Sequence, residues 1–436
     1  MIPRIVISLA FLISANAVAH ATQIYCDTIT KDDRNSTIND MCKIVISDQK
    51  WNTSSVDLSS VILPKFEKFS LIGINGSFSL DDFFSTKTSL EKLHIYGSVM
   101  HVIQIPAKLE SLLVTGCQTR QVVIANTDEY RYGIHTLVLV ENQISEIPHR
   151  IDQLIQLKSL DMANNLLEKV NFTEFNGLKE LNFVDLSLNR IRVVSIEMVD
   201  LPKLLKLDLS QNLLKSIPRN FGQLRALDDL NLSYNKLEYV EMSHFNGLTK
   251  LKVLDLQFNN LLIGSLAPAI LPALEVLRLE SCHLQQLDLF GIEMPKLKKL
   301  YLNDNKLEYV EWFNKEVYEG AGLNLYGDRN PWNCNWLPEM HPRVKFVRQQ
   351  DRIICRRFEK NVCCVGNDYT TERKADRRWQ VVKEQNRQIF MVLEEQQDKV
   401  RILGENCGMI GEQLAEIENT LAKVMRVVEA IAARVD

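Results

Sequence analysis

The sequence predicts an α/β solenoid: a horseshoe of stacked coils with a parallel sheet on its concave side, a disulfide-bonded cap at each end and an α-helical coiled coil after the second cap. Three observations predict it. A leucine pattern recurs every 23 or 24 residues through the middle of the chain, cysteines cluster just outside both ends of that array, and the C-terminal segment carries a heptad pattern. A fixed period of this length is typical of stacked repeats, in which each copy buries its apolar face against its neighbours.

The first 21 residues are typical of a secretory signal peptide. Arg4 precedes an apolar run at residues 5–13, and Ala17, Ala19 and Ala21 follow at the spacing of a cleavage site. No later stretch approaches the ~18 consecutive apolar residues that a spanning helix needs. We therefore expect a secreted protein with no membrane span.

Residues 22–65 are predicted to form an N-terminal cap. The first coil of a solenoid would otherwise expose its apolar face, and an oxidising compartment favours bridging of exposed thiols. Cys26 and Cys42 lie in this segment and are the candidates for one disulfide.

Residues 66–330 form the repeat array, with the pattern L-x-x-L-x-L-x-x-N-x-L. Regular copies begin at Ile134, Leu157, Leu181, Leu204, Leu227, Leu251, Leu274 and Leu297, and degenerate copies begin at Phe66, Leu90, Leu109 and Gly320. Each copy predicts one short strand, a turn, and an irregular or 3₁₀-like return. Stacking of the copies gives a leucine-rich-repeat horseshoe with a concave parallel sheet.

Position nine of each copy, counted from its first leucine, is almost always asparagine. The residues are Asn142, Asn165, Asn189, Asn212, Asn235, Asn259, Cys282 and Asn305, with Cys117 in a degenerate copy. An amide supplies both donors and an acceptor, so it can satisfy backbone groups where each chain turns out of the sheet. We expect the two thiols to be buried and structural.

Position five should face the concave side. It reads Val138, Asp161, Asp185, Asp208, Asn231, Asp255, Arg278 and Tyr301. A ladder of carboxylates could bind a cation or a basic ligand. Aspartate between two leucines is also a common filler in such repeats, and we favour this structural interpretation.

Residues 331–368 are predicted to form a cysteine-rich C-terminal cap. Its disulfide candidates are Cys334, Cys355, Cys363 and Cys364. Four thiols allow three pairings, and the sequence does not choose among them.

Residues 369–436 are predicted to form a coiled coil. Apolar residues alternate at spacings of three and four over about eight heptads. The stripe predicted to bind a partner comprises Ile389, Leu393, Leu403, Leu414, Ile417, Leu421, Val424, Val428 and Ile431. Such a stripe must be buried, against another chain or against the flank of its own solenoid.

Cys407 falls at an a position of these heptads, where residues of a parallel pair face one another. It is a candidate for an interchain disulfide, as are Cys363 and Cys364. The alternatives for Cys407 are a reduced core thiol or pairing back to one of those two cap cysteines.

Five N-x-S/T sequons agree with secretion and are candidate glycosylation sites: Asn35, Asn52, Asn75, Asn171 and Asn231. Asn231 is predicted on the concave face. A glycan there would obstruct part of that surface.

No catalytic motif occurs, and the eight histidines are scattered. We expect no enzyme activity, cofactor or metal site. The predicted partners are proteins, and no nucleic acid is expected.

The cap residues Asn330-Pro331-Trp332-Asn333-Cys334-Asn335-Trp336, the adjacent Cys363-Cys364 and the C-terminal coil together resemble the mosquito leucine-rich immune proteins. That resemblance implies a haemolymph protein that pairs with a paralogue or with itself. It further implies that the protein captures or stabilises a complement-like thioester protein, for attack on microbes or parasites. The alternatives are a decoy or receptor-like ectodomain that binds a microbial ligand on its concave face, and a matrix or adhesion protein.

Overall fold

The computed structural model describes strands at residues 6–9, 22–26, 41–45 and 68–72, and then residues 91–125 and 131–365, with gaps at 219, 265–268, 288, 290–291, 311–321, 349–357 and 360–361. The predicted coiled coil lies outside the described residues, as do most of the predicted signal peptide and N-terminal cap. Within the described part, no helix is long and apolar enough to cross a bilayer.

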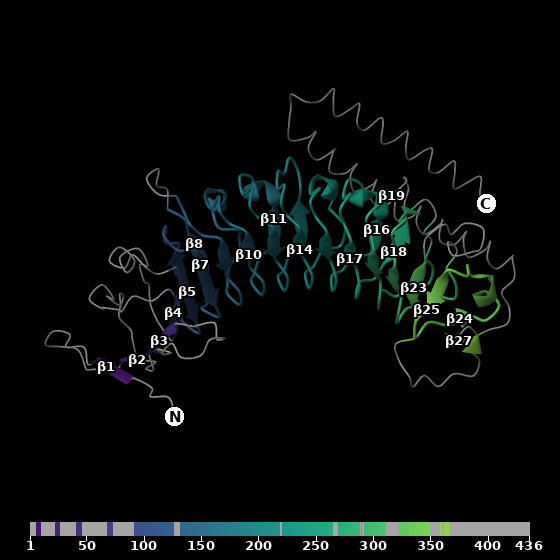
Figure 1. The fold of residues 1–436 in the computed structure, drawn as a ribbon, viewed down its shortest axis with the longest axis horizontal. Helices are drawn as coiled ribbons and strands as arrows, with labels where there is room; N and C mark the ends of the chain where they lie inside the picture. The colour runs from purple at the N-terminus through teal and green to yellow at the C-terminus, as the bar shows by residue number, and fades with distance from the viewer. Residues whose placement is uncertain are drawn as a thin grey trace, which may run out of the picture.

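One long sheet lines the concave side of a curved stack of coils, which confirms the predicted solenoid (Figure 1). Neighbouring strands pair in parallel from β3 onward, whereas β1, β2 and β3 pair antiparallel. In spatial order the strands are β1 (Val6–Leu9), β2 (Thr22–Cys26), β3 (Met41–Val45), β4 (Lys68–Ile72), β5 (Lys92–Tyr96), β7 (Ser111–Thr115), β9 (Thr136–Val138), β10 (Ser159–Asp161), β12 (Phe183–Asp185), β14 (Lys206–Asp208), β15 (Asp229–Asn231), β17 (Val253–Asp255), β20 (Val276–Arg278), β22 (Lys299–Tyr301), β23 (Leu323–Tyr326) and β25 (Val344–Phe346).

The return segments carry 3₁₀ turns, as the sequence predicts, and they also form short parallel strand pairs that the sequence did not predict. The 3₁₀ helices are η1 (Ile151–Gln153), η2 (Phe172–Phe175), η3 (Phe221–Gln223), η4 (Met242–Phe245) and η6 (Leu337–Glu339). The strand pairs are β6 (Val102–Gln104) with β8 (Gln121–Val123), β11 (Lys169–Asn171) with β13 (Val193–Ser195), β16 (Tyr239–Glu241) with β18 (Leu262–Gly264), and β19 (Ala269–Ile270) with β21 (Ile292–Glu293).

A single apolar core runs between the sheet and the return segments. From β9 to β22 of the long sheet, the central residue of each three-residue strand, such as Leu160 or Leu207, is buried, while the residues on either side are at least partly exposed. The opposite wall includes phenylalanines of the 3₁₀ turns, among them Phe172, Phe221 and Phe245. Burial of such side chains is the main force that holds one coil to the next.

The N-terminal strands extend the sheet beyond the repeats. In the antiparallel pairing of β2 with β3, Cys26 lies directly opposite Cys42. This register suits the disulfide predicted between them, because directly opposite residues bring their Cα atoms to about 4.5–5.5 Å. The first strand, β1, falls inside the predicted signal peptide. Cleavage after residue 21 would leave β2 as the first strand.

The last coil corrects one prediction. Leu325 lies opposite Leu300, and Tyr326 lies opposite Tyr301, so this copy begins at Gly322 and not at Gly320. The preceding coil therefore spans 25 residues, 297 to 321, which is longer than the regular period used to place the last copy. In the corrected register Asn330 takes position nine.

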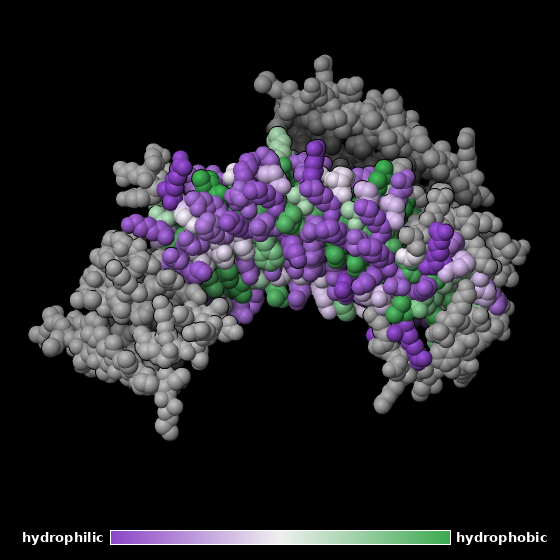
Figure 2. Space-filling model, in the orientation of Figure 1, coloured by the Kyte–Doolittle hydropathy of each residue, from purple (hydrophilic) through white to green (hydrophobic). Residues whose placement is uncertain are grey.

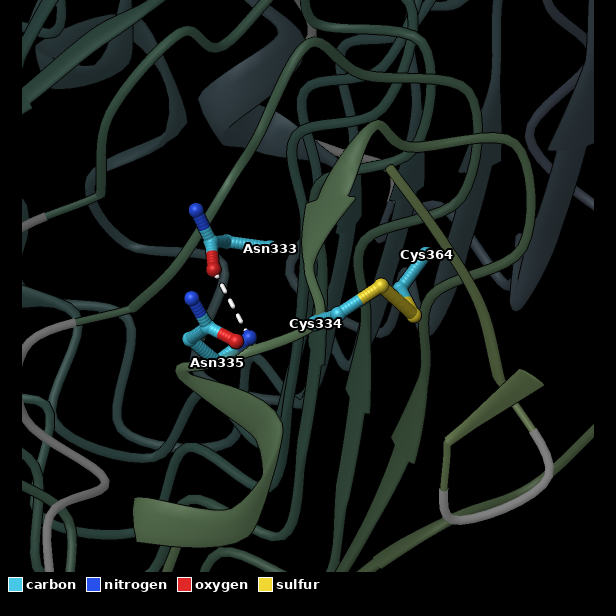
Figure 3. Close-up of a disulfide and its surroundings, with 4 residues drawn as sticks. All are labelled: Asn333, Cys334, Asn335 and Cys364. Carbon is cyan, nitrogen blue, oxygen red and sulfur yellow. Dashed lines mark hydrogen bonds between the residues drawn. A yellow bond between two sulfur atoms is a disulfide. The ribbon is translucent and has the colours of Figure 1, made fainter. Parts of the chain in front are cut away.

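The C-terminal cap packs against this last coil with a small sheet of β24 (Trp332–Asn333), β27 (Val362–Val365) and β26 (Phe358–Glu359). A disulfide joins Cys334, next to β24, to Cys364 on β27 (Figure 3). Cys363 is also disulfide-bonded. Cys364 was a candidate for interchain bonding, and its sulfur is instead bonded within the chain. Cys355 and Cys407 lie outside the described residues.

Aromatic packing closes the end of the core beneath this disulfide. Trp332 donates from Nε1 to the carbonyl oxygen of Gly327 at 2.6 Å and stacks on Trp336. A Cβ atom at Gly327 would lie 2.8 Å from Trp332 and 2.9 Å from Phe346, so the close fit requires glycine there.

Candidate interaction surface

The position-nine asparagines use their amide atoms for backbone groups, as predicted. Asn189 donates to the carbonyl oxygens of Met162, Leu186 and Ser187 at 2.9–3.1 Å, and its Oδ1 accepts from the N–H of Leu167 at 3.0 Å. Asn142, Asn165, Asn212, Asn235, Asn259 and Asn305 also donate to carbonyl oxygens of their own and the preceding coil, and Asn330 continues the series.

The two cysteines in this row are free and buried, which confirms the structural role expected of them. Cys117 donates to the carbonyl oxygen of Thr115 at 3.3 Å, and Cys282 donates to that of Leu256 at 3.2 Å. Burial raises the pKa of both thiols, to about 12 for Cys282.

The position-five residues also hold the backbone. The Oδ1 atoms of Asp161, Asp185 and Asp208 accept the N–H two residues further on at 2.8–3.0 Å. Asn231 and Asp255 do the same at 3.0 and 3.1 Å. These bonds support the structural interpretation of the ladder, because they satisfy a backbone donor at the point where each strand ends.

The second oxygen of Asp255 accepts from Gln257 Nε2 at 3.1 Å. Burial is the main cause that raises the pKa of Asp161, Asp185 and Asp255, and neighbouring carboxylates add to it. Asp208 Oδ2 accepts from Asn231 Nδ2 at 2.8 Å. Among the described residues, no group of three or more histidines, cysteines or acidic residues is arranged to hold a metal ion.

The C-terminal half of the concave face has a different character. Arg278 lies 3.9 Å from Asp255 and 3.8 Å from Glu280, and its guanidinium stacks over the ring of Tyr301 at 4.7 Å. Tyr301 stacks in turn on Tyr326, with ring centroids 4.3 Å apart. One column of touching side chains therefore crosses four strands, from an acid through a cation to two aromatic rings.

Glu280 occupies position seven beside this column. Its Oε2 atom is buried and has no hydrogen-bond partner. Burial raises the pKa of Glu280 to about 6, and the charge of Arg278 only partly opposes the rise.

Position eight, at the C-terminal end of each strand, adopts the left-handed conformation in every described coil from residue 97 onward. The residues are Gly97, Gly116, Glu141, Asn164, Leu188, Gln211, Tyr234, Phe258, Ser281, Asp304 and Arg329, all with φ between 53° and 63°. This turn lets the N–H donate to the next coil, as Leu188 does to Ser210 and Tyr234 does to Gln257. The repeat pattern alone predicts no role for this position.

Three of these left-handed residues are large, apolar or aromatic, and open to solvent. Leu188 is 44% exposed, Tyr234 is 47% exposed and Phe258 is 40% exposed. The rings of Tyr234 and Phe258 stack with centroids 4.1 Å apart. Figure 2 shows small hydrophobic areas scattered over an otherwise largely hydrophilic side of the solenoid.

A polar hollow on the return side is lined by residues of η3 and η4 and by residues that flank them, including Gln223, His244 and Asn246. The Gln223 and Asn246 side chains accept the backbone N–H groups of Val199 and Ile270 from neighbouring coils. These amides hold the coils together, so we assign the hollow to the architecture.

Two of the predicted glycosylation sites fall among the described residues. Asn171 is exposed, and its side chain accepts the N–H of Thr173 at the start of η2. Asn231 lies on the concave face, as predicted, and its sequon partner Ser233 is buried. Asn35, Asn52 and Asn75 lie outside the described residues.

The profile of the family described as leucine rich repeat matches residues 184–237 and 202–261. Pig fibromodulin (Sus scrofa) is 30% identical over 147 residues, which cover 34% of this chain and 97% of that sequence. The chain belongs to the leucine-rich repeat family.

Other leucine-rich repeat proteins match more of the chain at lower identity. Zebrafish keratocan (Danio rerio) is 27% identical over 215 residues, 49% of this chain and 57% of keratocan, and mouse podocan-like protein 1 (Mus musculus) is 29% identical over 182 residues, 41% of this chain and 32% of that protein. The chain thus spans between about a third and just over half of the length of these two relatives. Among solved structures, the leucine-rich repeat domain of APL1B superposes with a TM-score of 0.51 at 20% identity, over 68% of this chain and 86% of that domain. At this level of identity, the likeness to APL1B shows a shared fold alone.

Proposed function

We propose that this leucine-rich repeat chain is a secreted, non-catalytic innate-immune protein that dimerises and captures or stabilises a complement-like thioester protein, for attack on microbes or parasites. The observation that carries the proposal is the C-terminal cap. Its N-P-W-x-C-x-W sequence is closed by the bond between Cys334 and Cys364, and it resembles the cap of the mosquito leucine-rich immune proteins. Repeats alone would be weaker support, because they occur in many unrelated binding proteins.

The concave face supports binding in preference to chemistry. Its position-five carboxylates each hold a backbone N–H, and the column from Asp255 to Tyr326 pairs an acid, a cation and two rings with one another. Groups arranged in rows of this kind can contact a protein surface. General acid–base or nucleophilic catalysis instead needs groups that converge on one reacting atom.

Dimerisation is proposed to occur through the heptads of residues 379–435, with Cys407 as the interchain thiol. The pairing of Cys334 with Cys364 and the bonded state of Cys363 support this assignment, since both members of the adjacent cap pair are already bonded. Cys407→Ser should convert a dimer into a monomer on a non-reducing gel. Wild-type protein that runs only as a monomer would refute the interchain bond.

The partner is tested by purifying the chain without reductant from haemolymph or secreting cells and identifying what accompanies it by mass spectrometry. Co-purification of a thioester protein is expected, and a chain that purifies alone contradicts the proposal.

Deletion of residues 379–436 distinguishes the alternatives. We expect it to abolish partner capture, whereas a decoy receptor would retain its concave-face ligand with weaker avidity. A matrix or adhesion protein would instead be found in the insoluble extracellular fraction.

A further inference from the structure

Three large apolar or aromatic residues occupy position eight, and we call them the rim row: Leu188, Tyr234 and Phe258. Bulky residues are rare at positive φ, because the left-handed conformation brings Cβ close to the following carbonyl oxygen. Glycine and asparagine avoid this cost. The same turn is made by Gly97, Gly116 and Asn164 elsewhere in the solenoid. The backbone therefore gives no reason for large apolar residues in the rim row.

The core gives no reason either. Each residue of the rim row is at least 40% exposed, so a large part of its surface makes no contact with the core. Gln211 occupies the same position in the coil between Leu188 and Tyr234, and it is exposed and polar. A strained conformation occupied by exposed apolar residues points to a use outside the fold.

The rim row is also pre-organised. Leu188, Tyr234 and Phe258 occur within four consecutive coils whose strands are hydrogen-bonded to one another. The parallel stack of Tyr234 on Phe258 holds both rings in place. Rigid aromatic side chains of this kind commonly provide the largest contributions at protein interfaces, because little side-chain entropy is lost on binding.

Charge on the adjoining concave strands indicates the chemistry of the partner. Asp185, Asp208 and Asp255 lie three residues before Leu188, Gln211 and Phe258 in the same coils. Among the described residues, Arg278 lies within 4.0 Å of Asp255, whereas Asp185 and Asp208 form no ion pair. Neighbouring carboxylates also raise the pKa of Asp185 and Asp255, so the repulsion among them would be relieved by a cation. In the sequence, Arg190 and Lys236 follow two residues after Leu188 and Tyr234.

We propose that the rim row is a docking surface for a protein segment that places aromatic or aliphatic side chains on Leu188, Tyr234 and Phe258, and lysine or arginine over Asp185 and Asp208. This surface is independent of the C-terminal heptads and of the thioester partner proposed above. It would give the solenoid a second means of recruiting protein.

Peptides are selected against the full chain from a random 12-residue library displayed on phage. The affinities of the selected peptides are then measured for four proteins. These are the wild type, Tyr234→Asn/Phe258→Asn, Asp185→Asn/Asp208→Asn and the matched control Gln211→Asn. Asparagine is tolerated at positive φ, and Asn231 shows that asparagine can also hold the position-five backbone bond, so we expect each variant to keep its coils intact. Asp208→Asn also loses the hydrogen bond that Asp208 Oδ2 accepts from Asn231. Circular dichroism spectra that match the wild type, with a cooperative thermal transition, check that the coils are intact.

We expect selected peptides to combine aromatic or leucine residues with lysine or arginine. The aromatic double variant should bind them about tenfold more weakly or worse. The aspartate double variant should bind them more weakly at low salt, with a smaller difference at high salt, and Gln211→Asn should bind them as the wild type does. Acidic peptides, no peptides, or peptides that bind the aromatic double variant equally well would overturn the proposal.

Two further outcomes would assign the rim row to another occupant, and each of them would also overturn the proposal. Sedimentation velocity that shows wild-type self-association abolished in Tyr234→Asn/Phe258→Asn would identify a second copy of the chain. A tenfold gain in peptide affinity on deletion of residues 379–436 would identify the chain's own C-terminal segment.

Discussion

Positions eight and nine are neighbours in every coil, yet they differ in how the fold constrains them. Position nine is asparagine or cysteine in each regular copy, and its side chain is buried against backbone carbonyl oxygens. Position eight has one backbone conformation throughout, but its residues include glycine, glutamate, leucine, tyrosine, phenylalanine and arginine. A position whose side chain completes the backbone hydrogen bonds permits few residue types. A position that contributes only its φ angle leaves the residue type open to function.

The largest effect is expected at position nine. Asn189→Ala removes three donated bonds and one accepted bond, and it leaves buried backbone groups of two coils without partners. We expect a loss of about 3 kcal/mol in the free energy of unfolding, measured by urea denaturation, since an unsatisfied buried group costs about 1–3 kcal/mol.

Asn189→Cys is the matched control for this variant. Cys117 and Cys282 already donate to carbonyl oxygens at the same position, so the cysteine variant should recover part of the loss. Equal stability of the alanine and cysteine variants would show that the hydrogen bonds do not explain the residue choice.

An intermediate effect is expected at Glu280, one residue before position eight. Its folded-state pKa of about 6 lies above the ordinary value of 4.5, so the folded state binds this proton more tightly than the unfolded state does. The resulting stabilisation is present below about pH 4.5 and is lost as the pH rises to about 6. Arg278, Asp255 and Asp304 are the charged groups that affect it most.

Glu280→Gln should therefore flatten the fall in the urea midpoint between pH 4.5 and pH 7, relative to the wild type. Glu275→Gln is the control of opposite sign, because a hydrogen bond from Lys298 lowers the pKa of Glu275. The stabilisation from Glu275 is lost as the pH falls. If both variants change the pH profile in the same direction, the assignment of Glu280 is wrong.

The smallest effect is expected at Leu188. Leu188→Asn should raise the free energy of unfolding by up to about 1 kcal/mol, because asparagine relieves the left-handed strain and little packing is lost. Leu188→Val should lower it, since a branched Cβ is less tolerant of positive φ. Differential scanning calorimetry measures both changes, and a destabilised Leu188→Asn would mean that the leucine contributes to the fold.

Much of the solenoid could be predicted from the sequence, because periodic leucines and asparagines each meet a local demand of the coil. The strands, the 3₁₀ returns, the buried thiols of Cys117 and Cys282 and the role of position nine follow from that period. The last coil could not be placed correctly. It is set by the length of the loop before it, and Gly322 is recognised as its start only from the pairing of Leu325 with Leu300.

Features of the candidate surface were harder to predict, because they depend on contacts between coils and on φ angles. The stack of Tyr234 on Phe258 joins residues in neighbouring coils, and the column through Arg278 joins four strands. The unpaired oxygen of Glu280 depends on burial that no local pattern encodes. A signal was present at position eight, where apolar residues stand in a turn that favours glycine and asparagine.

The buried thiols of the solenoid also have a practical consequence for labelling. Thiolates, and not thiols, react with alkylating reagents such as maleimides. Cys117 and Cys282 are inaccessible and have raised pKa values, so they should stay unmodified while the protein is native. A fluorophore coupled without any mutation would therefore report on a cysteine outside the coils, and mass mapping of the labelled peptide would identify it.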